Sequence, residues 1–389
     1  MQGIGVWIFS NFKFLDLPSR GLNIYHPQPD VKDLESYTPG GYHPTSIGDS
    51  LVWLARDRQL ARYVALKTLV ADKSQDSREG TILELLANGD IKHGRRCLVG
   101  EPAGCSITES KENSTNSMFP LDAARSLAAQ LAMGLSICMR MEYLHAHNFL
   151  LRLPNLDSFS TAHMSALANH ISFLPRGVDG KPSTPHAPPR VTYPIFRNMP
   201  ANEQENPEVN IADYGTSSIV SQMPSPTLHM PTLYCLPEDF VGEPITTTAD
   251  VWTLGVALYE LLGERRLFET FTRAQEDIIG EMVNVLGKPP ARWWNCWANR
   301  PDINPGTIDF ACLNRPESRR LHPRIWWMGR GETPESCGWD VAGGEFKALE
   351  DMLRAMLSFE PKERPTPKQL LQMGSAGVGE TTSADSIRS

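Results

Sequence analysis

The sequence predicts an α+β fold with two lobes, a small one rich in strands and a larger one built from helices. Two short apolar runs, 51–55 and 63–67, flank the polar segment 56–59 and indicate an antiparallel hairpin. Residues 122–142 carry Ala and Leu at helical spacing, and residues 249–262 are apolar nearly all round. A helix without a polar face is buried on every side, so we expect the latter segment in the core of the helical lobe.

The composition is that of an ordinary globular protein and argues against several classes of function. With 389 residues, 41% of them hydrophobic, the chain is long enough to build two lobes with cores. Its formal net charge of -8 argues against direct binding of nucleic acid through the phosphate backbone. An acidic surface would instead attract basic peptides.

The cysteines and the apolar segments bear on the compartment. The seven cysteines are scattered and form no CxxC pair, which predicts neither a disulfide framework nor a zinc site, and therefore a reducing environment. The apolar start, residues 5–9, lacks a cationic flank and is too short to span a bilayer, so we expect neither a signal peptide nor a membrane helix. The expected location is cytoplasmic, nuclear or both. The oligomeric state has no signature in the sequence.

Proline and glycine divide the chain into segments. Residues 1–34 form an N-terminal extension, and residues 35–373 form the folded domain, whose small lobe ends at about residue 104 and whose helical lobe covers 105–373. Eight prolines between 175 and 207 indicate an inserted surface loop, placed within 152–208. The small polar residues 374–389 indicate a disordered tail.

Two charged residues of the small lobe are candidate partners of each other. Lys67 closes the second predicted strand, and Glu79 lies in the first turn of a helix expected over 76–86. Glu79 also fits an acidic residue that caps its own helix after Asp76, so both roles remain open.

Asp213 is a candidate metal ligand. It follows the apolar strand 209–212 and precedes Gly215, which can adopt a positive φ and aim the carboxylate. The alternative to a metal ligand is an ordinary Asp-x-Gly turn.

Glu238 and Arg364 are candidate partners although they are far apart in the sequence. Each lies beside apolar residues, and desolvated charges of this kind need a partner. The alternative is two separate surface charges.

The order of these landmarks resembles that of the protein kinases. The landmarks are Val64-Ala65-Leu66-Lys67, Asp213-Tyr214-Gly215, Leu236-Pro237-Glu238, Asp250-Val251-Trp252 and Arg364. Further segments resemble the SR-protein kinases of the CMGC class, particularly the divergent forms of filamentous fungi; they include 37–49, 52–57, 151–154, 282–287 and 290–294. The resemblance covers about residues 35–373.

This resemblance implies a bilobal kinase-like fold, ATP and Mg²⁺ as cosubstrates, and phosphoryl transfer to serine in Arg/Ser-rich proteins. It assigns Lys67 and Glu79 to ATP, and Asp213 and Asn148 to Mg²⁺. It assigns structural roles, and not catalytic ones, to Glu238, Asp250 and Arg364.

Two motifs of the family are missing from this sequence. A kinase catalytic loop runs His-x-Asp and reaches an Asn about five residues later, whereas His145 and Asn148 are three apart with no Asp between them. Gly48 leads almost directly into the run 51–55, which leaves no room for the first strand and its glycine-rich loop. The predicted small lobe is therefore truncated, and no catalytic base can be assigned.

Three hypotheses follow. The chain is a serine/threonine kinase with absent or impaired phosphoryl transfer, or it is a pseudokinase scaffold that binds basic peptides. In the third hypothesis another acid, such as Asp157 or Asp179, acts as the base, although neither has the expected position. An exon skipped in the transcript would leave the same two gaps.

Overall fold

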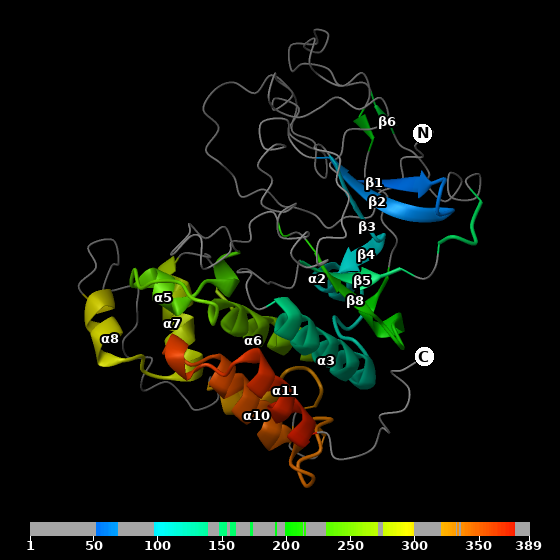
Figure 1. Cartoon of the computed structure of the whole chain (residues 1–389). Coiled ribbons are helices and arrows are strands. Elements are labelled where there is room, and N and C mark those ends of the chain that lie inside the picture. The colour runs from blue at the N-terminus through cyan, green and yellow to red at the C-terminus, as the bar shows by residue number, and fades with distance from the viewer. Residues whose placement is uncertain are drawn as a thin grey trace. The chain divides into compact units, whose positions relative to one another are not determined.

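The computed structural model describes residues 52–68, 97–138, 148–153, 156–160, 172–173, 191–192, 199–212, 214, 231–270, 275–298, 320–331, 333 and 336–377 (Figure 1). The chain divides into two compact units. The first comprises residues 1–110, 149–199 and 212–215, and the second comprises 111–148, 200–211 and 216–389. Strands dominate the described part of the first unit and helices that of the second, so the α+β class predicted from the sequence is confirmed.

The first unit contains an antiparallel sheet with the order β1-β2-β3. Its strands are β1 (Val52–Asp57), β2 (Arg62–Thr68) and β3 (Cys97–Gly100). The predicted hairpin is present but longer, because the polar residues Arg56 and Asp57 continue β1 and pair with β2. The Asp57 carboxylate accepts the backbone N–H groups of Gln59 and Leu60, so the turn starts two residues later than expected.

The first unit also contains two further antiparallel strand pairings. Strand β4 (Ala103–Ser106) pairs antiparallel with β5 (Phe149–Arg152), and β6 (Ser172–Phe173) pairs with β7 (Val191–Thr192). Gly104 is required in β4, since a Cβ there would lie 2.4 Å from the sulfur of Met199. Met199 is buried, and its carbonyl accepts a hydrogen bond from the Ser110 hydroxyl at 2.6 Å.

Two short regular elements lie within the segment predicted as a proline-rich insertion. It contains β7 and, in the second unit, the 3-10 turn η4 (Ala201–Glu203), whose Ala201 is fully buried. Pro200 precedes this turn with φ -58°, the value that its ring imposes, so here the proline favours a regular element instead of preventing one.

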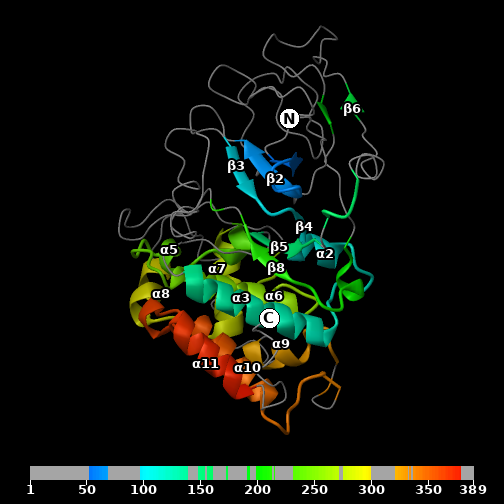
Figure 2. The same cartoon turned by 45° about the vertical axis from the view of Figure 1, so that its right-hand side comes forward.

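The second unit is helical. Its elements are α3 (Leu121–Cys138), β8 (Val209–Ile211), η6 (Thr232–Tyr234), α5 (Pro237–Phe240), α6 (Ala249–Leu262), α7 (Gln275–Leu286), α8 (Ala291–Ala298), α9 (Leu321–Trp326), α10 (Glu345–Met356), η9 (Pro361–Glu363) and α11 (Pro367–Gly377), while α2 (Ile107–Glu112) spans the boundary with the first unit. Helix α3 packs on α6 and α11, and α10 packs on the same two helices, so the four helices form a closed ring of contacts (Figures 1 and 2).

Helix α6 forms the core of this unit, as its composition predicts. Every residue from Ala249 to Leu262 is buried. Gly255 allows the end of α10 to approach, because a Cβ there would already lie 3.1 Å from the Cβ of Met356. Trp252 stacks on Phe268 with ring centroids 6.0 Å apart. No helix in the described part of the chain is long and apolar enough to cross a membrane.

Helix α3 presents the predicted apolar face. Leu127, Leu131 and Leu135 are almost completely buried, together with Ala124. The predicted continuation over 139–142 and the predicted helix at 76–86 lie outside the described residues. The tail at 374–389 overlaps the last turn of α11, which continues to Gly377.

Candidate functional site

Lys67 lies on the central strand of the three-stranded sheet. In the register it stands opposite Val52 of β1 and Leu98 of β3, so strand pairing on both sides holds its backbone. Its side chain is half-buried. Glu79, the proposed partner, lies outside the described residues, and the ion pair with Lys67 stays a prediction.

Asn148 stands immediately before β5 and is 4% exposed. The strand that follows is anchored by Phe149 and Leu151, which are both buried, so the position of Asn148 is set by core packing. His145 lies outside the described residues.

Asp213 also lies outside the described residues, but its neighbours are described. Strand β8 ends two residues earlier, at Ile211, and Tyr214 is buried in the same compact unit as Lys67. Within the second unit, Gln130 of α3 accepts the backbone N–H of Val209 at 3.0 Å and donates to the carbonyl of Pro207 at 3.0 Å. Gln130 therefore fixes the start of β8.

Glu238 and Arg364 are brought together in the structure. Two hydrogen bonds of 2.7 and 2.6 Å join the guanidinium to both carboxylate oxygens, and both side chains are 0% exposed. The Arg364 guanidinium also donates to the carbonyl oxygens of Ser358 and Thr248. This geometry suits a buried ion pair, since the charge is matched and four of the five guanidinium N–H groups have acceptors.

Asp250 lies in the first turn of α6 and is 2% exposed. A carboxylate near a helix N-terminus is stabilised by the helix dipole, which lowers the cost of burying it there. Arg364 also lies over the Trp252 ring of α6, 5.0 Å from its centroid. The three predicted structural residues are thus all buried on or around α6.

Comparison with known proteins agrees with this framework. The family model described as the protein kinase domain matches residues 197–374. The fold is that of a protein kinase.

Several serine/threonine kinases are similar to the chain along much of its length. A serine/threonine protein kinase of Aspergillus fumigatus is 21% identical over 94% of this chain and 93% of its own. The serine/threonine-protein kinase SRPK of Physarum polycephalum is 24% identical over 87% of this chain and 89% of its own. The mouse dual specificity protein kinase CLK4 is 23% identical over 72% of this chain and 50% of its own.

Asp157, one of the two other acids considered as a base, contacts the β1–β2 hairpin. Its Oδ1 accepts the backbone N–H of Tyr63 at 2.6 Å and a guanidinium N–H of Arg56 at 3.2 Å. It thereby holds the β1–β2 hairpin. Asp179, the other acid considered, lies outside the described residues.

A buried polar network connects three segments of the kinase fold's helical unit. The Tyr234 hydroxyl donates to the Glu260 carboxylate, and the Lys111 ammonium donates to the carbonyl oxygens of Glu260 and Gly263, the latter at 2.8 Å. Lys111 is 4% exposed, and burial lowers its pKa to about 8 against the opposing pull of Glu260. No motif in the sequence indicated Lys111, because its partners follow about 150 residues later.

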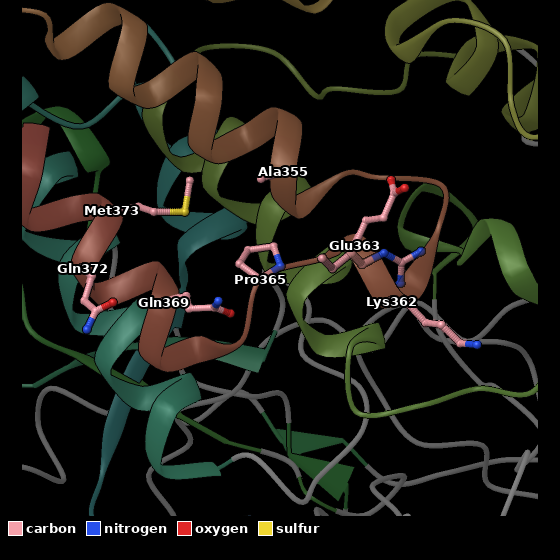
Figure 3. A pocket seen from close by; sticks show the side chains of 8 residues that line it. Ala355, Lys362, Glu363, Pro365, Gln369, Gln372 and Met373 are labelled. Atoms are coloured by element: carbon pink, nitrogen blue, oxygen red, sulfur yellow. The ribbon is translucent and has the colours of Figure 1, made fainter.

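An open cleft of about 570 Å³ lies beside the buried ion pair, between the end of α10, η9 and α11 (Figure 3). Its lining residues are Ala355, Lys362, Glu363, Arg364, Pro365, Gln369, Gln372 and Met373. Neither Lys67 nor Asn148, the two described residues predicted to bind ATP or Mg²⁺, is among them. Among the described residues no group of three or more His, Cys, Asp or Glu is placed to hold a metal ion.

Proposed function

We propose that this chain is a serine/threonine kinase-type protein, related to the SR-protein kinases, in which phosphoryl transfer is absent or severely impaired. The observation that carries the proposal is a contrast within the helical unit. The Glu238–Arg364 pair is complete and buried on α6, whereas the sequence from His145 to Asn148 contains no carboxylate. The structural framework expected of a kinase is therefore present, but its general base is missing.

The expected loss of rate follows from how kinases work. Phosphoryl transfer depends almost entirely on positioning and on electrostatic stabilisation of the transferred group. The catalytic Asp accepts the proton of the substrate hydroxyl, and the glycine-rich loop covers the phosphates. Loss of both together removes several powers of ten in rate, because each contributes to the same transition state.

The proposed nucleotide site consists of Lys67 and Glu79 for the phosphates of ATP and of Asp213 and Asn148 for Mg²⁺. ATP would supply the γ-phosphoryl group, and Mg²⁺ would neutralise its charge. Amide and carboxylate oxygens are ligands that Mg²⁺ accepts, and the buried position of Asn148 before β5 is compatible with such a fixed ligand. With no phosphate loop before β1 in the sequence, Lys67 would hold the phosphates as a single point charge, and we expect weak binding.

Restoration of the missing segments tests the proposal. The repaired variant carries a glycine-rich loop before Val52 and a catalytic loop with Asp two residues after His145. We expect Mg-ATP to raise the melting temperature of the repaired variant more than that of the parent chain, and the repaired variant to phosphorylate an Arg/Ser-rich peptide. A folded repaired variant that neither binds Mg-ATP nor transfers phosphate would contradict the proposal, because the loss of phosphoryl transfer would then have a cause other than the two missing segments.

The second candidate function is a pseudokinase scaffold for Arg/Ser-rich or other basic proteins. Two observations favour it, namely the formal net charge of -8 and the packing of α3, α6, α10 and α11 in the helical unit. Two of the similar proteins are named SRPK and CLK4. The location that suits such partners is the cytoplasm, the nucleus or both.

Fluorescence anisotropy with a labelled Arg/Ser-rich peptide tests this scaffold function. Binding should weaken steeply as salt is added, and a peptide with Glu in place of Arg should not bind. Equal binding of the two peptides would exclude charge-directed recognition.

A further inference from the structure

A small aromatic cluster joins α9 to α10 in the helical unit. The rings of Trp326 and Phe346 are stacked with centroids 3.7 Å apart and planes inclined by 12°. The His322 ring meets both edge-on, at 5.7 Å from Trp326 and 5.2 Å from Phe346. The His322 side chain is 51% exposed, so protons reach it freely from the solvent.

The hydrogen bonds of His322 determine which ring nitrogen carries the proton. The indole Nε1–H of Trp326 donates to Nε2 of His322 at 3.0 Å. An indole nitrogen only donates, so Nε2 must be an unprotonated acceptor. The other nitrogen, Nδ1, lies 2.7 Å from a carboxylate oxygen of Glu350 and therefore carries the proton that it donates. The contacts thus select the neutral Nδ1–H form.

Hydrogen bonds from Arg354 of α10 and His322 of α9 favour the ionised form of Glu350. Burial alone would raise the pKa of Glu350, but hydrogen bonds from Arg354 and His322 outweigh this effect and leave that pKa below its usual range. Arg354 donates to one carboxylate oxygen at 2.6 Å, while His322 takes the other. Of the arginines in or next to α9, Arg324 pairs with Glu281 and Arg320 donates to the carbonyl of Val283. Among the described residues, the charged groups joined to His322 by direct contacts are Glu350 and, through it, Arg354.

We propose that His322 is a proton-sensitive latch between α9 and α10. In the neutral form it accepts from Trp326 and donates to Glu350, so it links the two helices through both ring nitrogens. A proton added at Nε2 puts two N–H donors face to face and breaks the bond to Trp326. The bond to Glu350 then becomes an ion pair, in which the imidazolium shares one carboxylate with Arg354. Protonation therefore replaces the hydrogen bond to Trp326 with an ion pair to Glu350.

Imidazole is the side-chain group whose charge changes nearest to neutral pH, whereas carboxylates and guanidinium groups keep their charges there. The latch is independent of phosphoryl transfer.

Nitrogen NMR of the full chain, selectively labelled with ¹⁵N in His and Trp, tests the latch. At pH values above the titration of His322, the ring should show the Nδ1–H form. As the pH falls, the indole N–H signal of Trp326 should move with the same midpoint as the His322 nitrogens, and it should move more than the other indole signals. The Trp326→Phe variant identifies the signal. An Nε2–H form, or an indole signal of Trp326 that does not follow the titration of His322, would overturn the proposal.

Two variants separate the latch from a merely structural role. His322→Gln keeps one acceptor and one donor but has no titrating proton, so the pH-dependent shift of Trp326 should vanish while the circular dichroism spectrum is unchanged. Glu350→Gln removes the charge that favours the imidazolium, so the shared midpoint should move to lower pH. Should His322→Gln fail to fold, the Glu350→Gln result decides alone, and an unmoved midpoint there would contradict the proposal.

Discussion

Removal of one member of the Glu238–Arg364 pair should severely destabilise the helical unit. Arg364→Met preserves most of the volume of the side chain but leaves the Glu238 carboxylate without its two charge-assisted hydrogen bonds. Both side chains are 0% exposed, so water cannot replace the lost partner. The substitution also leaves the carbonyl oxygens of Ser358 and Thr248 without their guanidinium donor.

The magnitude follows from this burial. Breaking a buried ion pair by removing one partner costs about 3–5 kcal/mol, a large fraction of the roughly 5–15 kcal/mol by which domains are stable. Replacement of both charges, in the double variant Glu238→Leu with Arg364→Met, should cost clearly less than the sum of the two single variants. The reason is that the double variant buries no unpaired charge.

Urea unfolding followed by circular dichroism measures these differences. Lys347→Met is the matched control, since Lys347 pairs with Asp351 on α10 and both side chains are more than half exposed. That control should change the free energy of unfolding by no more than about 0.5 kcal/mol. An Arg364→Met variant as stable as the Lys347→Met control would refute the reasoning, as would single variants whose costs simply add in the double variant.

Two further predictions concern other polar contacts of the helical unit. Because the pKa of Lys111 falls from 10.5 to about 8 on folding, the unfolded chain binds more protons between these values and the stability of the folded state rises with pH. The free energy of unfolding should therefore rise by about 2 kcal/mol between about pH 7.5 and about pH 9.5, and Lys111→Met should remove this rise. A pH dependence of urea unfolding that Lys111→Met leaves unchanged would contradict the burial of a titrating amine. Arg292, which is 49% exposed and binds both Glu243 and Glu360, should behave differently. Arg292→Ala should cost at most about 1 kcal/mol, and less in high salt, because solvent and ions screen the pair; a loss as large as that of Arg364→Met, insensitive to salt, would exclude this explanation.

The features that could be predicted from the sequence are those encoded by neighbouring residues. Helix α6 is apolar around its whole circumference, and that property alone places it in the core. Strands β1 and β2 follow from two apolar runs with a polar connection, although the backbone contacts of Asp57 moved the turn. Glu238 and Arg364 were predictable as a pair because charges among apolar neighbours need partners.

The features that could not be predicted depend on partners distant in the sequence. Gln130, Asp157 and Lys111 look like ordinary polar residues, and only the folded chain shows what they bind. Asp157 contacts a strand 94 residues earlier, and Lys111 contacts carbonyl oxygens about 150 residues later. Backbone acceptors carry no signal of residue type, so neither contact has a sequence pattern.

The rate of phosphoryl transfer by the purified chain tests the central claim most directly. The assay contains Mg-ATP with a radiolabelled γ-phosphate and an Arg/Ser-rich peptide, and the Asp213→Ala variant provides the background. We predict that label incorporation by the parent chain equals that background, because the sequence supplies no acid after His145 and no phosphate loop before Val52. Transfer at an ordinary kinase rate of about 1–100 per second, abolished by Asp213→Ala, would contradict the account.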